Sequence, residues 1–346
     1  MNRIRFNCDY NEGAHPRILQ RLSDTNFEQT AGYGEDPHCD RARALILEAC
    51  GNPDADVWLL VGGTQTNLTV ISAALRPHQG VLSAQSGHIN IHESGAIEAT
   101  GHKVLTLPSA DGKITAAQVE KAVDSHFSDE TQIHMVQPKM VYISHPTEIG
   151  TLYTKAELTA LHEVCRKYGL YLYMDGARMG YGLTAPGSDL TLPDIARLCD
   201  AFYIGGTKVG ALFGEALVLC HPLLREDFPY MIKQKGGLLA KGRLLGIQFE
   251  TLFEDGLYYE LGRHANEAAA VIRNACIQKG YPFFCDSPTN QQFPILPNTV
   301  LDALSAKYAY ATWEKMDDAH TAVRFCTSWC TRMEDAEQLA HDILTF

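Results

Sequence analysis

The sequence predicts an α/β protein in which a seven-stranded, mostly parallel sheet with helices on both faces is followed by a smaller α+β domain. Seven short apolar runs alternate with helical patterns over residues 57–219, an order typical of parallel sheets that are covered on both faces. Near residue 252 the composition changes to long amphipathic helices and short strands. We therefore expect an N-terminal arm over residues 1–22 that packs with the small domain, a large domain over 23–251 and a small C-terminal domain over 252–346.

The composition of the 346 residues favours an ordinary globular protein, because 45% of them are hydrophobic. The net charge is −12 and the basic residues are scattered, which argues against nucleic-acid binding. The apolar runs stop short of the ~20 residues of a membrane span, and the first residues lack the apolar core of a signal peptide, so we expect a cytoplasmic protein that does not enter membranes. Ten dispersed cysteines predict free thiols in a reducing compartment.

The expected strands of the large sheet are residues 57–61, 81–82, 104–108, 140–144, 170–174, 201–204 and 216–219. Asp36, followed by proline, predicts the start of the first long helix, and Gly51 predicts its end. Thr115 and Thr154 each begin a capping-box pattern, which predicts two further helix starts. Residues 125–137 are polar and predict a loop without a metal, because the two histidines there lie eight apart with no carboxylate or thiol at ligand spacing.

In the small domain we expect a helix over 260–279, a strand over 291–296, a helix over 301–308, a last strand over 322–329 and a final helix that begins with a capping box at 331–334. Arg324 stands inside the apolar last strand. Burying a guanidinium without an anionic partner is costly, so we expect Arg324 to face an anion. An internal Asp or Glu is the ordinary partner.

Two neighbouring strand ends carry an acid and an amine. Residues 170–174 lead directly to Asp175, and residues 201–204 lead through two glycines and a threonine to Lys208. Parallel sheets bind ligands outside the carboxyl ends of their strands, so both groups can face one bound molecule. Pyridoxal phosphate (PLP) chemistry uses such a pair: the amine attaches the cofactor covalently, and the carboxylate keeps the pyridine nitrogen protonated. Taken singly, an Asp that caps a strand and a Lys on a solvated turn are the commoner situation.

The strand over 57–61 runs into two glycines and a threonine that precede a helix. Strand, glycines and helix N-terminus together form an anion site, because exposed backbone N–H groups and the positive end of the helix dipole face the same point. Tight turns use the same residues, so this segment alone is weak evidence.

The runs over 175–178 and 205–208 resemble the PLP-dependent enzymes of fold type I, and within them the threonine aldolase and β-eliminating lyase group. Residues 33–37, 62–67, 88–90 and Arg324 also match in family order, so the similarity covers nearly the whole chain. The Pro-Thr-Glu run that includes Thr147 is similar to the low-specificity branch of the L-threonine aldolases. The resemblance implies the fold type I architecture and PLP as cofactor.

The resemblance also implies roles for single residues. It makes His88 the catalytic ring that stacks on the cofactor, with Glu93 supporting its imidazole. It assigns the cofactor phosphate to Gly63 and Thr64, with Thr207 as a second hydroxyl. The substrate carboxylate is assigned by the same resemblance to Arg178 and Arg324.

Departures from the family pattern affect two positions. The histidine that the family places after the fourth strand falls on Thr147, with His145 two residues earlier, so the base for the substrate hydroxyl stays open. Cys8 occupies a position where the family often has a serine for the substrate carboxylate; a small buried residue is the alternative interpretation.

The family builds its active sites from two chains, and the resemblance implies this for the present sequence. Tyr33, Lys233 and Lys241 match segments that serve the cofactor site of the neighbouring subunit. A homodimer, or a homotetramer made of two dimers, is therefore expected. A charged run such as the one that holds both lysines is otherwise an ordinary solvated face.

The function that these motifs favour is cleavage of the Cα–Cβ bond of L-threonine, L-allo-threonine and related β-hydroxy-α-amino acids to glycine and an aldehyde. The alternatives are β-elimination or transamination on the same fold, and a PLP-fold binding module without catalysis. Retention of Lys208, Asp175 and Arg178 together argues against the last of these.

Overall fold

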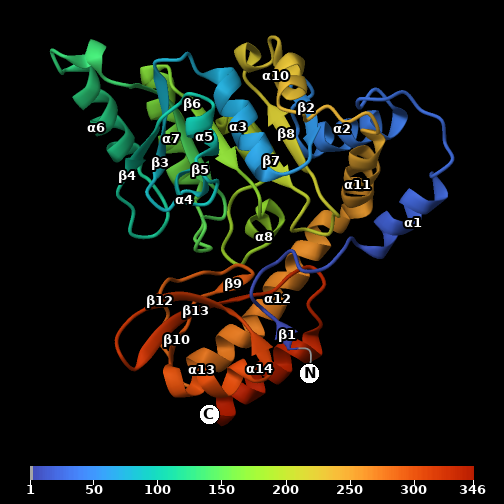
Figure 1. The fold of residues 1–346 in the computed structure, drawn as a ribbon, viewed down its shortest axis with the longest axis vertical. Coiled ribbons are helices and arrows are strands. Elements are labelled where there is room, and N and C mark those ends of the chain that lie inside the picture. The colour runs from blue at the N-terminus through green and yellow to red at the C-terminus, as the bar shows by residue number, and fades with distance from the viewer. Residues whose placement is uncertain (1–2) are drawn as a thin grey trace.

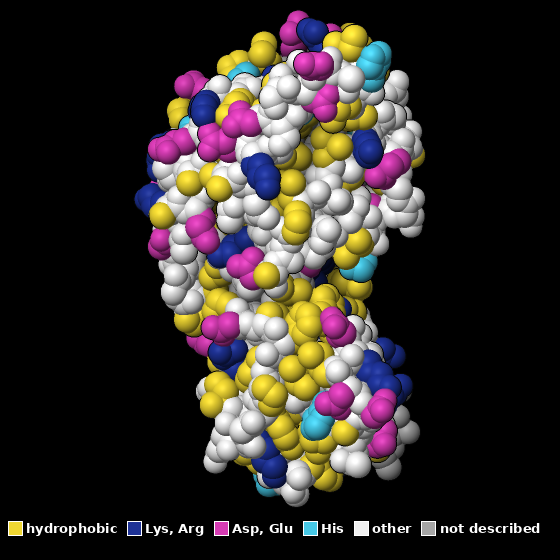
Figure 2. All heavy atoms as spheres, turned by 90° about the vertical axis from the view of Figure 1, so that its left-hand side faces the viewer, with side chains coloured by type: hydrophobic (Ala, Val, Ile, Leu, Met, Phe, Trp, Pro, Cys, Tyr) yellow, Lys and Arg dark blue, Asp and Glu magenta, His cyan; other side chains and the backbone are white. Residues whose placement is uncertain are grey.

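The computed structural model describes residues 3–346 and shows a larger body that holds the main sheet above a smaller body (Figure 1). The long helix α12 (Leu257–Gln278) runs from one body into the other. Figure 2 shows one face, on which acidic and basic side chains are interspersed and hydrophobic side chains gather where the two bodies meet. None of the helices within residues 3–346 combines the length and apolarity needed to cross a membrane.

The main sheet has seven strands in the spatial order β2-β8-β7-β6-β5-β3-β4. Their bounds are β2 (Asp56–Leu60), β3 (Gln79–Ala84), β4 (Val104–Leu107), β5 (Gln137–Ser144), β6 (Tyr171–Asp175), β7 (Ala201–Gly205) and β8 (Glu215–Leu219). Strands β4, β3, β5, β6 and β7 are mutually parallel, whereas β8 is antiparallel to both β7 and β2. The predicted seven-stranded, mostly parallel sheet is thus confirmed.

The register brings five strand ends to one edge. Ser144 at the end of β5 lies opposite Asp175 at the end of β6. Glu215, the first residue of the antiparallel β8, lies opposite both Gly205 of β7 and Leu60 of β2. Carboxyl ends of four strands therefore meet the amino end of β8 at the edge where α/β sheets bind ligands.

The helices of the larger body are α1 (Pro16–Asp24), α2 (Pro37–Cys50), α3 (Gly63–Ala74), α4 (His88–Ile91), α5 (Ala96–Ala99), α6 (Ala116–Phe127), α7 (Lys155–Tyr168), α8 (Met179–Leu183), α9 (Leu192–Leu198), α10 (Phe228–Gln234) and α11 (Arg243–Phe253). The expected caps form: Asp36 accepts a hydrogen bond from the Cys39 backbone N–H, and Gly51 ends α2 in the left-handed region at φ 59°. The capping boxes at Thr115 and Thr154 are both complete.

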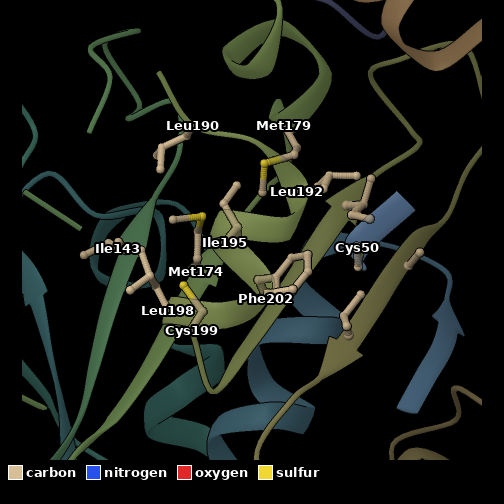
Figure 3. Close-up of a cluster of buried hydrophobic side chains, with 14 of the residues drawn as sticks. Cys50, Ile143, Met174, Met179, Leu190, Leu192, Ile195, Leu198, Cys199 and Phe202 are labelled. Carbon is tan, nitrogen blue, oxygen red and sulfur yellow. The ribbon is translucent and has the colours of Figure 1, made fainter. Parts of the chain in front are cut away.

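A buried apolar cluster fixes the position of the central strands. Figure 3 shows Leu192, Ile195 and Leu198 of α9 against Met174 of β6 and Phe202 of β7. All five side chains are nearly or fully buried, and each contributes about 1.5–3 kcal/mol relative to exposure. Because β6 and β7 carry the residues around the ligand edge, this packing holds that edge rigid.

The smaller body is built on β13 (His320–Cys326), which pairs with β9 (Gln291–Gln292), β10 (Ile295–Pro297) and β12 (Ala311–Lys315). Helices α12, α13 (Asn298–Ser305) and α14 (Met333–Thr345) complete it. The N-terminal arm joins this body, because β1 (Ile4–Arg5) pairs with β11 (Tyr308–Ala309) and Phe6 is fully buried in the same core. The arm is thereby carried back toward the ligand edge of the main sheet.

Several local expectations were wrong. The helix expected over 301–308 lies at Asn298–Ser305, with Tyr308 in β11, and the strand expected over 322–329 ends at Cys326. The helix expected to end before the polar 125–137 segment continues to Phe127 as α6. The strand over 291–296 is divided into β9 and β10, with Pro294, which lacks a backbone N–H for a ladder, in the gap. The capping box at 331–334 does not form, because the Thr331 hydroxyl accepts a hydrogen bond from the Ser328 backbone N–H and α14 begins after Arg332.

Candidate active site

A cavity of about 320 Å³ opens at the carboxyl edge of the main sheet, a volume within the usual range of small-ligand sites. It brings together the predicted residues Gly63, Thr64, His88, Asp175, Arg178, Thr207 and Lys208. It is also lined by Ser144, Pro146, Glu148, Tyr203 and Glu215, and by Tyr10 from the N-terminal arm. The predicted residues Arg324, Tyr33, Lys233 and Lys241 do not line it.

Asp175 is held by four hydrogen bonds and is 4% exposed. Tyr203 donates its hydroxyl to Oδ1 at 2.5 Å and Tyr142 donates to Oδ2 at 2.6 Å; Asn67 and the Ala177 backbone N–H complete the set. Burial alone would raise the pKa of Asp175, but the positive charge of His88 and these hydrogen bonds outweigh burial and lower it. The cavity therefore presents a rigid, ionised carboxylate.

His88 begins the short helix α4, and its Nδ1 lies 2.8 Å from Oε1 of Glu93. Asn67 donates to the same Glu93 oxygen at 2.7 Å and to Asp175 at 3.1 Å, so it links the histidine to the acid. Burial would lower the pKa of His88, but the Glu93 hydrogen bond and the charge of Asp175 raise it. The pairing fixes the imidazole plane at the cavity wall, which agrees with the supporting role expected for Glu93.

Lys208 follows β7, and the hydroxyl of the fully buried Tyr181 donates to its backbone carbonyl. Burial and the neighbouring Arg178 lower the pKa of the Lys208 amine. A lysine with a lowered pKa is more often unprotonated, which is the form that attacks a carbonyl carbon. Burial also raises the pKa of Glu215, another carboxyl of the cavity, to about 8.

The segment around Gly63 has the form of an anion site. Helix α3 begins at Gly63, and its N-cap Gly62 offers no side-chain hydrogen bond to the first-turn N–H groups. A Cβ at Gly63 would lie 2.9 Å from the Tyr203 hydroxyl, so a side chain there would collide with the wall that holds Asp175. Thr207 donates its hydroxyl to Glu215 and accepts from the Gly214 N–H, so part of its hydrogen bonding is internal.

The two predicted carboxylate-binding arginines have different surroundings. Arg178 donates through Nε and Nη2 to both oxygens of Asp9, at 2.7 and 3.0 Å, and Asp9 is fully buried. Burial would raise the pKa of Asp9, but Arg178, Lys208 and the hydrogen bond from Asn290 hold it far below its usual value. Arg178 thus lines the cavity as one half of an ion pair.

Arg324 has only uncharged partners among residues 3–346. It donates to the Asn7 carbonyl at 2.9 Å and to the Gln291 side chain at 3.2 Å, and its guanidinium lies 5.8 Å from the ring centre of Trp313. Its Nε is buried and meets no acceptor within the described part of the chain. The internal Asp or Glu that would be the ordinary partner is therefore not found there.

The turn after β5 is where the resemblance leaves the identity of the catalytic base open, and its residues divide into two groups. His145 is fully buried, and burial lowers its pKa to about 4. Thr147 is also fully buried, and its hydroxyl bonds to Thr151 at 2.7 Å. Neither residue lines the cavity, whereas Glu148 does.

Cys8 and the three residues expected to serve a partner subunit lie outside the cavity lining. The Cys8 thiol is buried and donates to Asn11 at 3.1 Å. Tyr33 is 48% exposed, and the Lys233 ammonium lies 4.4 Å from the centre of its ring. Lys241 is also exposed.

The cavity fits PLP on three structural grounds. A buried, ionised carboxylate is the partner that a protonated pyridine nitrogen requires. The free first turn of α3 suits a phosphate group, because its N–H groups are uncommitted to a cap. Lys208 lines the same cavity, and its amine is the kind of group that forms the covalent bond to PLP. Within residues 3–346 no group of side chains is placed to hold a metal ion.

Comparison with known proteins agrees with this chemistry. The model of the β-eliminating lyase family matches residues 14–245. A low-specificity L-threonine aldolase from a Pseudomonas species is 29% identical over 343 residues, which cover 98% of this chain and 96% of that protein. The structure of a threonine aldolase from Leishmania major has a TM-score of 0.96 and 47% identity, with 98% of both chains covered. Aspartate aminotransferase from Thermus thermophilus, at a TM-score of 0.70 and 12% identity, shares the fold alone.

The fold and the cavity define a PLP-dependent lyase of fold type I. The chain belongs to the β-eliminating lyase family, and within it to the threonine aldolase type. The predicted fold, cofactor and family are confirmed, whereas the roles given to single residues stay predictions.

Sequence reasoning missed Asp9, Asn67, Tyr142 and Tyr203. The two tyrosines carried a signal, since each stands in an otherwise apolar buried strand, where a phenolic hydroxyl needs a partner. Asp9 and Asn67 carried none, because their partners Arg178 and Asp175 lie 169 and 108 residues away.

Proposed function

We propose that this chain cleaves the Cα–Cβ bond of L-threonine, L-allo-threonine and related β-hydroxy-α-amino acids to glycine and an aldehyde. The observation that carries the proposal is that Lys208, Asp175 and Arg178 line one cavity. Arg324, outside that lining, has no carboxylate partner among residues 3–346. Similarity to the Leishmania major threonine aldolase over 98% of both chains supports the substrate class.

When bound, PLP supplies an electron sink for the electron pair left on Cα. Lys208 would hold it covalently, through an amine whose pKa is lowered. Asp175 would balance the charge of the protonated ring nitrogen, and four hydrogen bonds prevent its carboxylate from turning away. His88, at the cavity wall, would contact the ring, and Gly63 and Thr64 would bind the phosphate through backbone N–H groups.

Substrate orientation depends on the arginines. Arg324 binds the α-carboxylate by charge, and the Nη1 group of Arg178, which has no hydrogen-bond partner among residues 3–346, is the second donor. Two fixed points on the carboxylate, with the amine near Lys208, restrict rotation about the bonds to Cα. This restriction selects the conformer in which the Cα–Cβ bond can break, the kind of positioning that lowers a barrier through entropy.

Lys208→Ala tests the proposal. Borohydride reduction should leave cofactor on the wild-type chain and none on the variant, and production of glycine and acetaldehyde from threonine should be nearly lost. Lys139→Ala, at the opposite end of the sheet, is a matched lysine control and should keep both. Labelling of the variant with surviving cleavage would show that another lysine carries the cofactor. Pyruvate and ammonia without glycine would show β-elimination instead.

We also propose that the protein is a homodimer, or a homotetramer of two dimers, with active sites shared between chains. Gly63, Thr64 and Thr207 are neutral donors for a dianionic phosphate, and the exposed pair of Lys233 and Tyr33 lies off the chain's own cavity. A Lys208→Ala chain mixed with a Lys233→Ala/Lys241→Ala chain should recover activity that each lacks alone. A fully active monomer in light scattering would contradict the shared site.

A cytoplasmic location is part of the same proposal. The structure describes all ten cysteines as free thiols, most of them buried, which suits a reducing compartment.

A further inference from the structure

We propose that the Glu148 carboxylate is the base that accepts the β-hydroxyl proton of the substrate, in place of the histidine that the chain lacks at this position. This inference rests on the proposed Cα–Cβ cleavage. It assigns a catalytic role to a residue in the turn that follows β5.

Glu148 is the member of that turn whose charged group reaches the site. Its neighbour Thr147 is fully buried and bonded to Thr151. His145 is sealed in the interior, where its Nδ1 accepts from the Tyr153 N–H and its Nε2 is buried with no partner among residues 3–346. Glu148, by contrast, lines the cavity together with His88, Ser144 and Pro146. A proton on a ligand in the cavity is accessible to Glu148 and inaccessible to His145.

The hydrogen bonds of Glu148 leave one oxygen for a ligand. Oε1 accepts from the Ser144 hydroxyl at 2.7 Å and from the His88 backbone N–H at 2.8 Å. These two donors fix the carboxylate plane, and Oε2 has no hydrogen-bond partner within the described residues. Oε2 is the remaining acceptor of a side chain that lines the cavity, so we expect the substrate hydroxyl to approach this oxygen.

The other acids of the cavity, and His88, already have hydrogen-bond partners within the protein. Asp175 has both oxygens engaged by four donors. Glu215 accepts from Thr207 on one oxygen and from the Gly206 N–H on the other. His88 is paired with Glu93 through Nδ1. Glu148 is thus the cavity carboxylate with an uncommitted oxygen in the described chain.

The charges around Glu148 favour proton acceptance. Burial raises the pKa of Glu148, and the nearby negative charge of Asp175 acts in the same direction, against the hydrogen bonds from Ser144 and His88. Tyr142 and Tyr153 also lie near the Glu148 charge, and because their own pKa values are raised both stay neutral near neutral pH. The positive groups that line the same cavity are His88, Arg178 and Lys208. A carboxylate with a raised pKa is a stronger base than an exposed one, and general bases work best when their pKa approaches the working pH.

The step balances within the substrate and this side chain. Glu148 takes the hydroxyl proton, and the O–H electron pair becomes the second bond of the aldehyde carbonyl. The Cα–Cβ bond breaks and leaves its pair on Cα, which gains a proton to give glycine. The proton count is unchanged, because the proton lost from oxygen is matched by the one gained at carbon.

Glu148→Gln separates this role from a structural one. The amide keeps an oxygen for Ser144 and His88 but cannot accept the proton. Threonine cleavage should fall by about 100-fold or more, the usual contribution of a general base. Exchange of the glycine α-proton with deuterated water, which NMR can follow, involves no substrate hydroxyl. The rate of this exchange in Glu148→Gln should therefore stay within about threefold of the wild-type rate. Glycine binding, titrated by cofactor absorbance, should be unchanged. Glu163→Gln, exposed on α7, is the matched control and should alter none of these.

The pH profile gives a second test. In the wild type, kcat/KM for threonine should fall as the pH drops through the Glu148 pKa. This acidic limb should be absent in Glu148→Gln and should move to higher pH in Ser144→Ala, which removes a donor to the carboxylate. If Glu148→Gln does not fold, Glu148→Asp carries the test and should keep the limb with reduced turnover.

Three outcomes overturn the inference. Equal loss of cleavage and glycine exchange would show that Glu148 supports the cofactor or the wall, and unchanged cleavage would show that another group takes the proton. An acidic limb that persists in the pH profile of Glu148→Gln would also show that another group takes the proton. A wild-type enzyme that exchanges the glycine proton but makes no glycine from threonine would instead overturn the proposed function itself.

Discussion

Arg178 of the larger body and Arg324 of the smaller body are both predicted to bind the substrate carboxylate, but their charges are balanced differently. Arg178 lines the cavity, whereas Arg324 does not. Arg178 is paired with Asp9 through two hydrogen bonds, and Asp9 also receives one from Asn290. Arg324 meets only a backbone carbonyl, a Gln side chain and the face of Trp313 among residues 3–346. The fold balances the charge of Arg178, whereas no carboxylate among residues 3–346 balances that of Arg324.

The difference separates stability from binding. A buried ion pair is costly to break, because removing one partner leaves the other charge uncompensated. A cation whose partners are all neutral contributes little to the stability of the fold. When an anionic ligand binds next to it, the two charges attract each other strongly. Asp9 also ties the N-terminal arm to Arg178 of the larger body and Asn290 of the smaller one, so the balanced arginine contributes to the assembly of the site.

The strongest test of the comparison is Asp9→Asn. It should lower the free energy of unfolding by about 3–5 kcal/mol, because Arg178 is left buried without its anion. Arg324→Gln is the control, and its stability should stay within about 1 kcal/mol of wild type, since no buried ion pair is lost. Urea unfolding of the three proteins measures this. Equal losses in both variants would show that Arg324 has a structural anion after all.

The next effect is on binding. Arg324→Gln should weaken glycine and threonine binding by about 2–4 kcal/mol, or roughly 30- to 1,000-fold, because the ligand carboxylate loses its charged partner. Absorbance titration with glycine and KM for threonine report it. Lys315→Gln, on neighbouring β12, removes an exposed charge and should change neither. Unaltered glycine affinity in Arg324→Gln would remove this residue from the site.

The dependence of the free energy of unfolding on acid pH should differ between the variants Asp9→Asn and Arg324→Gln. The folded pKa of Asp9 lies far below its ordinary value of 3.8. The stabilisation is therefore complete above the unfolded pKa and is lost as the pH falls from about 4 toward the folded value, with a slope of up to about 1.4 kcal/mol per pH unit. Asp9→Asn should flatten this part of the unfolding curve, whereas Arg324→Gln should keep it. A parallel curve in Asp9→Asn would place the pairing elsewhere.

The smallest effect concerns the support of Arg324. Trp313→Leu removes the aromatic face 5.8 Å from the guanidinium. Because an aromatic face stabilises a cation by about 0.5–1 kcal/mol, KM for threonine should rise roughly two- to fivefold. Trp313→Phe retains an aromatic ring and should give a smaller rise. A change as large as that of Arg324→Gln would mean that Trp313 shapes the site itself.

Much of the larger body could be predicted because its signals are local. Asp36 and Gly51 mark the ends of α2, and Thr115 and Thr154 mark the starts of α6 and α7. Caps and strand patterns act within a few residues, so they can be read along the chain. The Thr331 cap failed because a competing local hydrogen bond to Ser328 took its hydroxyl.

The sequence by itself determined the sheet, the acid and amine at its edge and the cofactor class, because each depends on residues that are neighbours in the chain or on family motifs. Only the tertiary structure decided which charges are balanced. The Arg178–Asp9 pair joins residues 169 positions apart, and the isolation of Arg324 depends on what packs around β13. Charge balance in a buried site is set by distances of a few ångströms in space, and sequence separation carries no information about them.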